Sequence, residues 1–486
     1  MDRILNKTTG RLSRREFLRH SVLAGLAVGA SSILAACAPQ AAPAPTTAPV
    51  QPTEAPTTAP AEATEAPAAQ ATEVPTAAPA SSGAVTLRFV TNHGESDVPL
   101  FQHVIKNFMD KYPDIKIDHL DIAGNEFYDT INTQGAGGGL PDVWYTRTFD
   151  VPVYASRKWT ISLQSLVERD AAEVNVDDFW PAEVAQMKWN GELYALPYDF
   201  SNIGIYYNKA MFASSSVDLP PDKWTWPDLV TLALKFVKKE NGEFSAWGLQ
   251  FYNWDWVFMG LLFGWGGKIW TDDFSQCVID SPENRDCFQF FVDARNQGVY
   301  PEAGATPQGV DPFAAGLLAM SFQGSWATTY MRDQIKDKFD FDVTAMPLSP
   351  KGNSCINAAG GAWGIAATSK NQEAAWKFNK FLTSTESTNI LISEPLRSIP
   401  GRQSSVPLWE QKAAEGGMPP KNVEVFAKQM QGANAVPYPP YWRDFETAWN
   451  NQIAPLLDGT VKDKPETVLA SFQSEVNRII SQSKGS

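Results

Sequence analysis

The chain has 486 residues, a formal net charge of −14, 17 tryptophans, 4 cysteines and 4 histidines. An acidic chain with no basic patch is unsuited to a phosphate backbone, so we expect no nucleic-acid partner. The cysteines are too few for a disulfide framework, and no metal-binding, phosphate-binding or nucleophile motif occurs, so we expect no cofactor, no metal and no catalysis.

The chain begins with a pattern typical of an export signal. The pair Arg14-Arg15 is followed by an apolar run to about Leu34 that is too short to span a bilayer. The run ends in Leu-Ala-Ala-Cys, which resembles a bacterial lipobox, so residues 1–37 are predicted to be a twin-arginine lipoprotein signal with lipid on Cys37. The alternative is a plain secretory signal in which Cys37 is incidental. We therefore expect an exported protein, anchored by lipid to the outer face of the cell membrane.

Residues 38–84 are mostly Ala, Pro, Thr, Gln and Glu, and they predict a disordered tether. Such a segment cannot bury an apolar face, so it cannot offset the entropy of ordering. Frequent proline keeps the chain extended at about 3 Å per residue, which gives a reach on the order of 100 Å. The tether either lets a globular body swing near the membrane or only lifts it clear of the cell surface.

The body of the chain alternates predicted strands and helices. Apolar periodicity and helix-start signals, including Ser281 before Pro282, define these elements. The alternation predicts an α/β protein, and some four hundred residues are too many for one compact core and fit two lobes. The predicted strands are 85–90, 115–118, 140–144, 193–199, 203–207, 318–322 and 363–366; the predicted helices are 100–111, one from Phe127, 226–239, one from Pro282, 372–382 and 466–480.

Many tryptophans lie beside Gly, Pro, Asn or Asp, which indicates loops rather than strand interiors. A tryptophan on a loop suits a sugar, because its ring face stacks on the C–H face while polar neighbours bind the hydroxyls. Those in this setting are Trp144, Trp254, Trp256, Trp265, Trp326, Trp363 and Trp442.

Short motifs follow one another along the body: Gly139-Leu-Pro-Asp-Val143, Leu196-Pro-Tyr-Asp199, Ile205-Tyr-Tyr-Asn-Lys209, Gly324-Ser-Trp326 and Gly360-Gly-Ala-Trp-Gly-Ile365. Their order resembles the extracellular solute-binding proteins, family 1, of ATP-driven sugar importers, the group that includes maltose-binding protein. The resemblance implies the two-lobed α/β periplasmic-binding-protein fold (type II), with the ligand cleft between the lobes. It also implies a monomer that captures a sugar or oligosaccharide and delivers it to the permease subunits of an ABC importer.

By the same analogy the chain crosses between lobes near 193–198, 353–361 and 396–401. Residues 85–195 plus 359–400 would form lobe 1, and residues 196–358 plus 401–486 would form lobe 2. Closure of both lobes on the ligand would be a hinge motion, because the ligand contacts both sides of the cleft.

The resemblance places ligand contacts on residues whose chemistry suits a sugar. Trp326 and Trp363 would stack on it from opposite lobes, Asp199 would accept from its hydroxyls, and Arg397 would donate a fork of hydrogen bonds. The alternatives are structural: a surface plug for each tryptophan, a hinge hydrogen bond or helix cap for Asp199 and a hinge salt bridge for Arg397. The further candidates are His93, Glu95, Asn202, Trp254, Asp255, Tyr441 and Trp442.

Cys277 and Cys287 flank a predicted strand-to-helix turn. A disulfide is possible there if the Cα atoms approach within about 7 Å. Cys355 would then be a spare buried thiol.

Two other functions stay open at this point. A surface-anchored glycoside hydrolase would also have an aromatic cleft, but it needs two carboxylates about 5–10 Å apart across the scissile bond. A binder of a non-sugar solute such as a polyamine would need several carboxylates to neutralise the amines.

Overall fold

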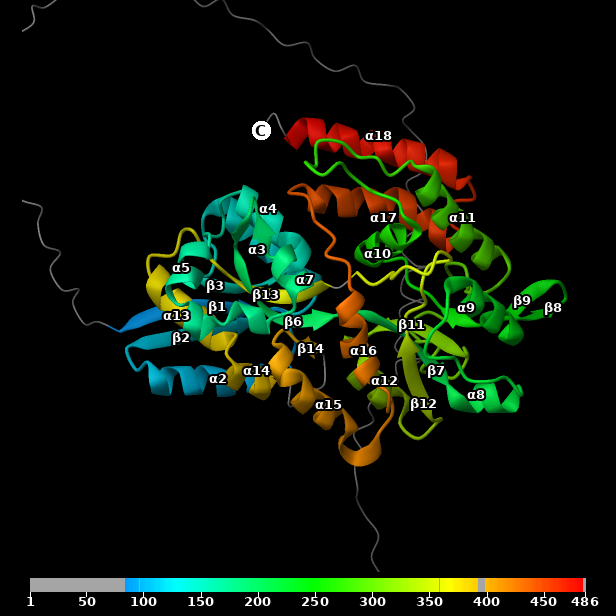
Figure 1. Ribbon diagram of the computed structural model, residues 1–486, viewed down its shortest axis with the longest axis horizontal. Coiled ribbons are helices and arrows are strands. Elements are labelled where there is room, and N and C mark those ends of the chain that lie inside the picture. Colours follow the sequence, from blue (N-terminus) through cyan, green and yellow to red (C-terminus); the bar gives the residue numbers. More distant parts are fainter. Residues whose placement is uncertain (1–83, 96, 358, 392–397, 484–486) are drawn as a thin grey trace, which may run out of the picture. The chain divides into compact units, whose positions relative to one another are not determined.

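The computed structural model describes residues 84–95, 97–357, 359–391 and 398–483 (Figure 1). The predicted signal, the tether up to residue 83 and Arg397 lie outside these residues. Two sheets organise the body, and we call the part built on the six-stranded sheet the first lobe and the part built on the four-stranded sheet the second lobe.

The sheet of the first lobe is mixed. β1 pairs in parallel with β2 and β3, whereas β13 runs antiparallel to β3 and β6, and β14 runs antiparallel to β6. In spatial order its strands are β14 (Ile399–Pro400), β6 (Ala195–Ser201), β13 (Ala359–Ile365), β3 (Val143–Arg147), β1 (Val85–Thr91) and β2 (Ile115–Asp121).

Helices cover both faces of this sheet (Figure 1). Successive strand residues point to opposite faces. Accordingly Phe89 packs in the cluster with α2 and α13, and its neighbour Val90 packs in the cluster with α3 and α4. The helices of this lobe are α2 (Val98–Lys111), α3 (Asn125–Gly137), α4 (Val151–Ser156), α5 (Gln164–Arg169), α6 (Ala171–Val174), α7 (Pro181–Gln186), α13 (Gln372–Leu382) and α14 (Thr385–Leu391).

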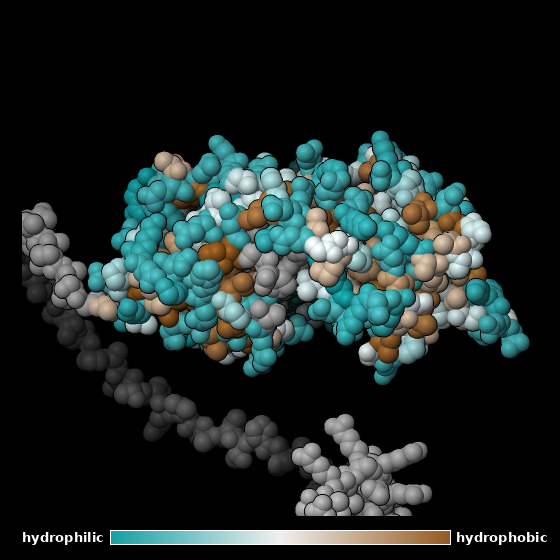
Figure 2. Space-filling view, turned by 90° about the horizontal axis from the view of Figure 1, so that it is seen from below, coloured by the Kyte–Doolittle hydropathy of each residue, from teal (hydrophilic) through white to brown (hydrophobic). Residues whose placement is uncertain are grey.

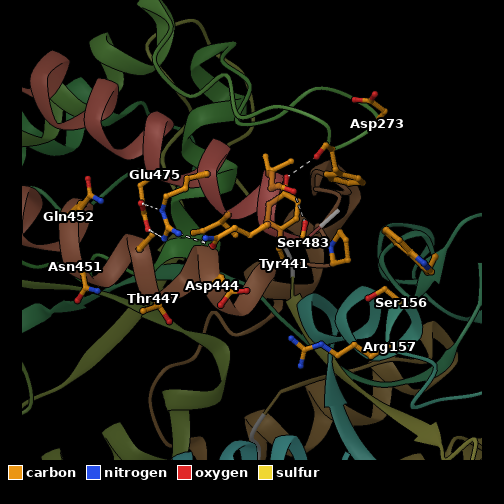
Figure 3. A pocket seen from close by; sticks show the side chains of 18 residues that line it. Ser156, Arg157, Asp273, Tyr441, Asp444, Thr447, Asn451, Gln452, Glu475 and Ser483 are labelled. Carbon is orange, nitrogen blue, oxygen red and sulfur yellow. Dashed lines mark hydrogen bonds and ion pairs between the residues drawn. The ribbon is translucent and has the colours of Figure 1, made fainter. Parts of the chain in front are cut away.

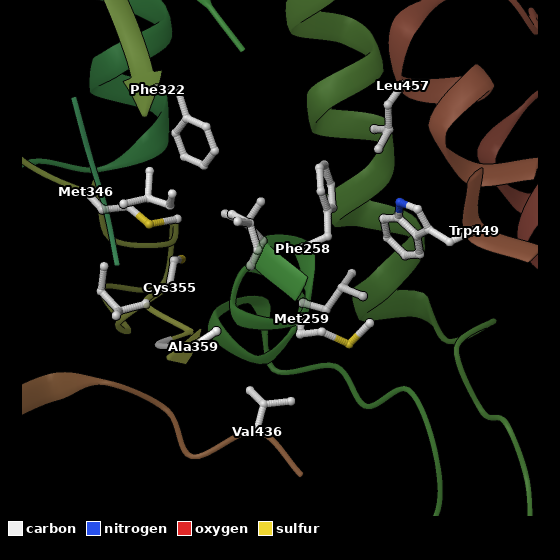
Figure 4. Close-up of a cluster of buried hydrophobic side chains, with 14 of the residues drawn as sticks. Phe258, Met259, Phe322, Met346, Cys355, Ala359, Val436, Trp449 and Leu457 are labelled. Carbon is white, nitrogen blue, oxygen red and sulfur yellow. The ribbon is translucent and has the colours of Figure 1, made fainter. Parts of the chain in front are cut away.

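The sheet of the second lobe has the order β10 (Leu249–Gln250), β11 (Met320–Gly324), β7 (Ile203–Asn208) and β12 (Phe341–Ala345). Its apolar core lies around the almost wholly buried helix α10, where Phe258 stands 5.6 Å from Trp449 between ring centroids (Figure 4). The helices between β7 and β12 are α8 (Lys209–Ser214), α9 (Trp226–Ala233), α10 (Asp255–Trp265), α11 (Pro282–Asn296) and α12 (Thr328–Ile335).

Four helices follow β14: α15 (Val406–Ala414), α16 (Glu424–Gln429), α17 (Trp442–Asp458) and α18 (Pro465–Ser483). α17 packs against α18 and α11 of the second lobe. Two antiparallel hairpins lie outside the two main sheets: β4 (Lys188–Trp189) with β5 (Glu192–Leu193), and β8 (Lys238–Glu240) with β9 (Glu243–Ala246). The 3-10 turns are η1 (Thr148–Asp150), η2 (Val176–Asp178), η3 (Leu234–Phe236), η4 (Ser325–Ala327), η5 (Gln403–Ser405), η6 (Glu415–Gly417) and η7 (Met430–Gly432).

The first crossover lies later than predicted. β6 remains a strand of the first sheet up to Ser201, and β7 of the second sheet begins at Ile203, so the chain crosses at Asn202 and not near residues 193–198. The predicted boundary between residues 195 and 196 therefore falls inside the first lobe. A continuous β6 is favoured because β13 and β14 hydrogen-bond to both of its edges.

Several predicted elements match the structure closely. The helix over 372–382 is α13, the helix from Pro282 is α11, and the Ser281 hydroxyl accepts from the Asn284 N–H at 3.3 Å as an N-cap. The helix predicted over 226–239 is shorter, because α9 ends at Ala233 and the chain turns through η3 into β8.

The face seen in Figure 2 is mostly hydrophilic, with apolar residues scattered in small groups. Within the described ranges, the structure contains no helix that is both long enough and apolar enough to cross a membrane.

Candidate functional site

A cavity of about 460 Å³ opens where the strands β1, β2 and β3 end. The first lobe supplies the residues that follow β1 and β2, together with residues of β3, β6 and β13, and the second lobe supplies Trp256 and Trp326. In open α/β sheets, the carboxyl ends of parallel strands form the usual ligand crevice. Because both lobes line it, this cavity is the candidate binding site.

Tryptophans form the wall on the second lobe. Trp326 lies in η4 directly after β11, partly exposed, with its ring centroid 5.8 Å from that of Trp256 and the planes inclined at 49°. A Cβ on Gly324 would come within 2.0 Å of the Trp326 ring, so the ring lies flat against this glycine. Trp254 stacks between Tyr252, at 4.5 Å, and Trp256, at 6.4 Å. The packing fixes the two cavity-lining rings, which present apolar surface suited to a sugar face.

Asp199, Gly360 and Gly361 form part of the cavity wall on the first lobe. The Asp199 carboxylate lines the cavity and accepts a hydrogen bond from the Gly361 N–H at 2.8 Å. A Cβ on Gly361 would come within 2.3 Å of the Tyr145 ring and 2.7 Å of the Asp199 Oδ1, so only glycine fits there. Opposite Gly361 and Ala362, β6 has a bulge in which Tyr198 is the extra residue between Asp199 and Pro197, so the pairing of the two strands is irregular at this close approach.

Arg147 places a positive charge in the wall of the cavity. Its guanidinium lies between the rings of Tyr128, at 3.8 Å, and Phe149, at 4.2 Å, and its Nε donates to the Asp150 carboxylate at 2.8 Å. Burial alone would lower the pKa of Arg147, but the charge of Asp150 overrides that effect and raises the pKa above its usual value. Sequence reasoning missed Arg147, although a lone arginine at the end of an apolar strand was a usable signal.

Glu183 is a second residue that the sequence did not reveal. It is fully buried in α7, next to Gly360 of β13, and neither carboxylate oxygen has a hydrogen-bond partner among the described residues. Burial and the nearby charge of Asp199 raise its pKa well above the usual range, which favours the neutral acid. Glu183 does not line the cavity, so its effect on the site is electrostatic.

The cavity brings together three of the predicted residues, namely Trp326, Asp199 and His93. The His93 ring stands edge-on to Tyr145 at 5.0 Å and to Tyr198 at 5.3 Å. The neighbouring Glu95 is exposed and does not line the cavity.

Trp363 was wrongly predicted to be a stacking surface. It is 0% exposed in β13, and its ring packs against Phe89 at 5.2 Å and Tyr198 at 5.0 Å. Trp442 is also 0% exposed, stacked on Phe445 at 5.1 Å, so it is a core residue too.

The other candidates on the second lobe have structural partners. Asn202 is 0% exposed and donates to the Phe426 carbonyl at 2.8 Å, which makes it an anchor at the crossover. Trp254 supports Trp256 but does not line the cavity. Asp255 is buried, and its Oδ1 accepts from the Trp256 N–H at 2.7 Å. Burial, followed by the charge of Glu446, raises the pKa of Asp255 to about 7.

Tyr441 lies in a different hollow, of about 860 Å³, between α17, α18 and the loop of Phe274 on the second lobe and Arg157 and Trp189 on the first (Figure 3). The Tyr441 hydroxyl donates to the Phe274 carbonyl at 3.1 Å. Among the described residues, none lines both this hollow and the cavity at the strand ends. Its Arg478 is already paired with Glu475 at 2.6 Å, so we place the binding site in the smaller cavity.

The disulfide that the sequence left open does not form in the described part of the chain, where Cys277 and Cys287 are buried free thiols, as is Cys355. Burial raises the pKa of Cys277 to about 12 and that of Cys287 well above its usual value, which suppresses the reactive thiolate. No group of three or more His, Cys, Asp or Glu side chains among the described residues is placed to hold a metal ion.

Known proteins resemble this chain in sequence. The model of the bacterial extracellular solute-binding protein family matches residues 94–389. A mannitol-binding protein from Pseudomonas aeruginosa is 24% identical over 322 residues, which cover 63% of this chain and 70% of that protein. A maltotriose-binding protein from Pyrococcus abyssi is 24% identical over 311 residues, covering 63% of this chain and 64% of that protein. The chain thus spans about two thirds of the length of these relatives.

Solved structures resemble it in fold. An ABC substrate-binding protein from Listeria monocytogenes in complex with cycloalternan has a TM-score of 0.70 at 23% identity, covering 82% of this chain and 99% of that chain. A solute-binding protein from Agrobacterium vitis with bound D-mannitol has a TM-score of 0.64 at 20% identity, covering 82% and 99%. These likenesses confirm the predicted two-lobed α/β fold, and the family match covers more than half of the residues, so the chain belongs to the bacterial extracellular solute-binding proteins.

Proposed function

We propose that this protein captures a sugar, a sugar alcohol or an oligosaccharide in the cavity between its lobes and delivers it to the permease of an ABC importer. One observation carries the proposal: two fixed tryptophan rings of the second lobe face a wall with Asp199, His93 and Arg147 on the first lobe. Apolar ring faces opposite a few hydrogen-bonding groups are what a polyhydroxylated ligand requires. The mannitol- and maltotriose-binding relatives support the same ligand class.

The lining of the cavity argues against the two alternatives. Among the described residues that line it, Asp199 is the only Asp or Glu. A glycoside hydrolase of the usual kind needs a pair of carboxylates, and a polyamine site needs several carboxylates. The positive charge of Arg147 would also repel an amine. We therefore propose binding without catalysis.

The proposal is tested by calorimetric titration of the full chain with maltotriose, D-mannitol and putrescine. We expect saturable one-to-one binding of maltotriose or mannitol, none of putrescine, and no hydrolysis of maltotriose after prolonged incubation. Binding of putrescine alone would support the polyamine alternative, and turnover abolished by Asp199→Asn would support the hydrolase.

We further propose that the body is held at the membrane by lipid on Cys37, through the tether of residues 38–84. The lipobox-like sequence and the Pro-rich segment support this, because an anchored body needs a spacer that cannot fold. A monomer on such a tether would present bound sugar to the permease. Mass spectrometry of protein extracted from membranes should find diacylated Cys37 at the mature N-terminus, whereas an unmodified N-terminus elsewhere would contradict the anchor.

A further inference from the structure

One carboxylate connects the wall of the cavity to the second lobe. Asp150 ends η1, directly after β3, and is fully buried. Its Oδ2 lies 2.8 Å from Arg147 Nε, and its Oδ1 lies 2.8 Å from Arg443 Nη2. Arg147 belongs to the first lobe and lines the cavity, whereas Arg443 belongs to α17 of the second lobe. Each oxygen of Asp150 therefore serves a different lobe.

The two guanidinium groups also share an aromatic ring. Arg147 lies over the Tyr128 ring at 3.8 Å, and Arg443 lies over the same ring at 5.0 Å. Arg443 also forms an ion pair with Glu446, in which its Nη1 lies 2.7 Å from the Glu446 Oε2. Without Asp150, two cations would lie over the same ring in a largely water-free space, where repulsion is strong.

Apolar contacts bring the two lobes together at the same place. The Phe149 ring, next to Asp150, packs against Trp442 at 5.5 Å and Tyr438 at 5.6 Å. Phe149 also lines the cavity. The cross-lobe ion pair therefore lies at the edge of the binding site, where a small change in lobe separation alters the shape of the cavity.

Arg147 retains donor capacity toward the cavity side of this network. Its Nε is used by Asp150, and the rest of its guanidinium belongs to a side chain that lines the cavity and is 18% exposed. A guanidinium fixed by a carboxylate on one edge can donate to ligand oxygens from its other nitrogens.

We infer that Asp150 is a positioning residue that clasps the two lobes through Arg443 and orients Arg147 for the ligand, so that lobe closure and ligand recognition depend on the same carboxylate. This clasp, the pairing of Asp150 with both Arg147 and Arg443, consists of contacts within the protein itself. Its effect on sugar affinity rests on the proposed function.

The test uses Asp150→Asn in the full chain. An amide can accept from one guanidinium but turns its NH₂ group toward the other, so one of the two contacts is lost and the charge balance fails. Spin labels on exposed positions, Lys116→Cys in the first lobe and Lys235→Cys in the second, report the lobe separation in a Cys37→Ser background. The other cysteines are buried and will not compete for the label.

We expect longer label distances in ligand-free Asp150→Asn than in wild type, and a partial return in Asp150→Asn/Arg443→Met, which removes the unbalanced cation. Arg443→Met alone should lengthen the distances, and Arg443→Lys, which keeps one ion pair, should recover them. A matched control is Glu475→Gln, because it breaks an exposed ion pair on α18. Circular dichroism checks folding, and Arg443→Met, compared with Arg443→Lys, keeps the test valid if Asp150→Asn fails to fold.

The second readout is calorimetry with maltotriose. Its Kd should weaken on the order of tenfold in Asp150→Asn and stay unchanged in Glu475→Gln, by loss of one charge-assisted contact. Wild-type distances in both Asp150→Asn and Arg443→Met, or no recovery in the double variant, would overturn the clasp. If no sugar binds the wild type, the proposed function fails, but the label distances still decide about the clasp.

Discussion

Replacing Trp326 by alanine should weaken sugar binding while leaving the fold intact. One ring face lies against Gly324, and the ring lines the cavity. A tryptophan buries about 150–250 Å² in full, so a sugar on its open face covers roughly half of that area. At about 25 cal/mol per Å² this corresponds to ~2–3 kcal/mol, or roughly thirtyfold to a hundredfold in Kd.

Trp363→Ala should behave in the opposite way. Trp363 is 0% exposed and packs among five aromatic side chains, so its loss leaves a core cavity that costs about 3–5 kcal/mol of unfolding free energy. That is a large part of the stability of a typical protein, so the variant should melt early or fail to accumulate.

The two variants are compared by titration with maltotriose and by thermal melting. Trp326→Ala should have a near wild-type melting temperature and weak binding, and Trp363→Ala should have a low melting temperature. Wild-type Kd in Trp326→Ala would show that the site is misplaced. A fully stable Trp363→Ala would show that the packing around β13 is wrong.

Gly324→Ala should also weaken maltotriose binding, because a Cβ within 2.0 Å of the Trp326 ring must displace the ring. Calorimetry checks this prediction, and the control is Gly137→Ala, whose Cβ meets nothing within 4 Å. Burial raises the pKa of Asp255 to about 7, whereas the pKa in the unfolded chain is about 3.9. Between these values the folded state binds more protons than the unfolded state, so its stability falls as the pH rises from about 4 to 7. Asp255→Asn retains the acceptor for the Trp256 N–H and should raise the unfolding free energy above pH 7, by at most ~4 kcal/mol, but change it little near pH 4. Denaturant titrations at pH 4.5 and 8 decide, and equal stability of both proteins at pH 8 would contradict the burial argument. Cys37→Ser should release the protein from membranes into the soluble fraction, as immunoblots of fractionated cells would show, and continued membrane retention would count against the lipid anchor.

The sequence predicted the elements well where periodicity and helix caps act locally. α13 and α11 begin where the apolar pattern and the Ser-Pro start signal place them. β3 was predicted about three residues too early, because Leu140 and Pro141 are apolar but lie outside the strand. Only pairing with β1 and β13 fixes the ends of β3, and pairing is a long-range property that one strand does not encode.

The candidate site was only partly predictable, because glycine beside tryptophan has two physical causes. At Trp326 the glycine is the last residue of β11, directly before η4, and the ring lies over it at the cavity. At Trp363 the glycines are part of β13: Gly361 makes room for Tyr145 and Asp199, whereas a Cβ on Gly364 would meet Trp144 only at an ordinary contact distance of 3.5 Å. The same local composition therefore predicts a loop in one case and a tightly packed strand in the other. Only the register of β13 against β3 and β6 separates them.

Asn202 shows how the crossover and the cavity depend on each other. It is the single residue between β6 and β7, and its amide donates to the Phe426 carbonyl at 2.8 Å and accepts from the Gln429 side chain at 2.8 Å. Both partners belong to α16, so Asn202 is fixed to the helix that packs on β7 and β12. Ser201, one residue earlier, still lines the cavity and bonds Ser398 of the first lobe at 3.1 Å. A change in the angle between the lobes therefore requires backbone rotation at the Ser201–Asn202 peptide and at the other crossovers. Asp199, two residues before this peptide, moves with the first lobe, whereas Trp326 moves with the second.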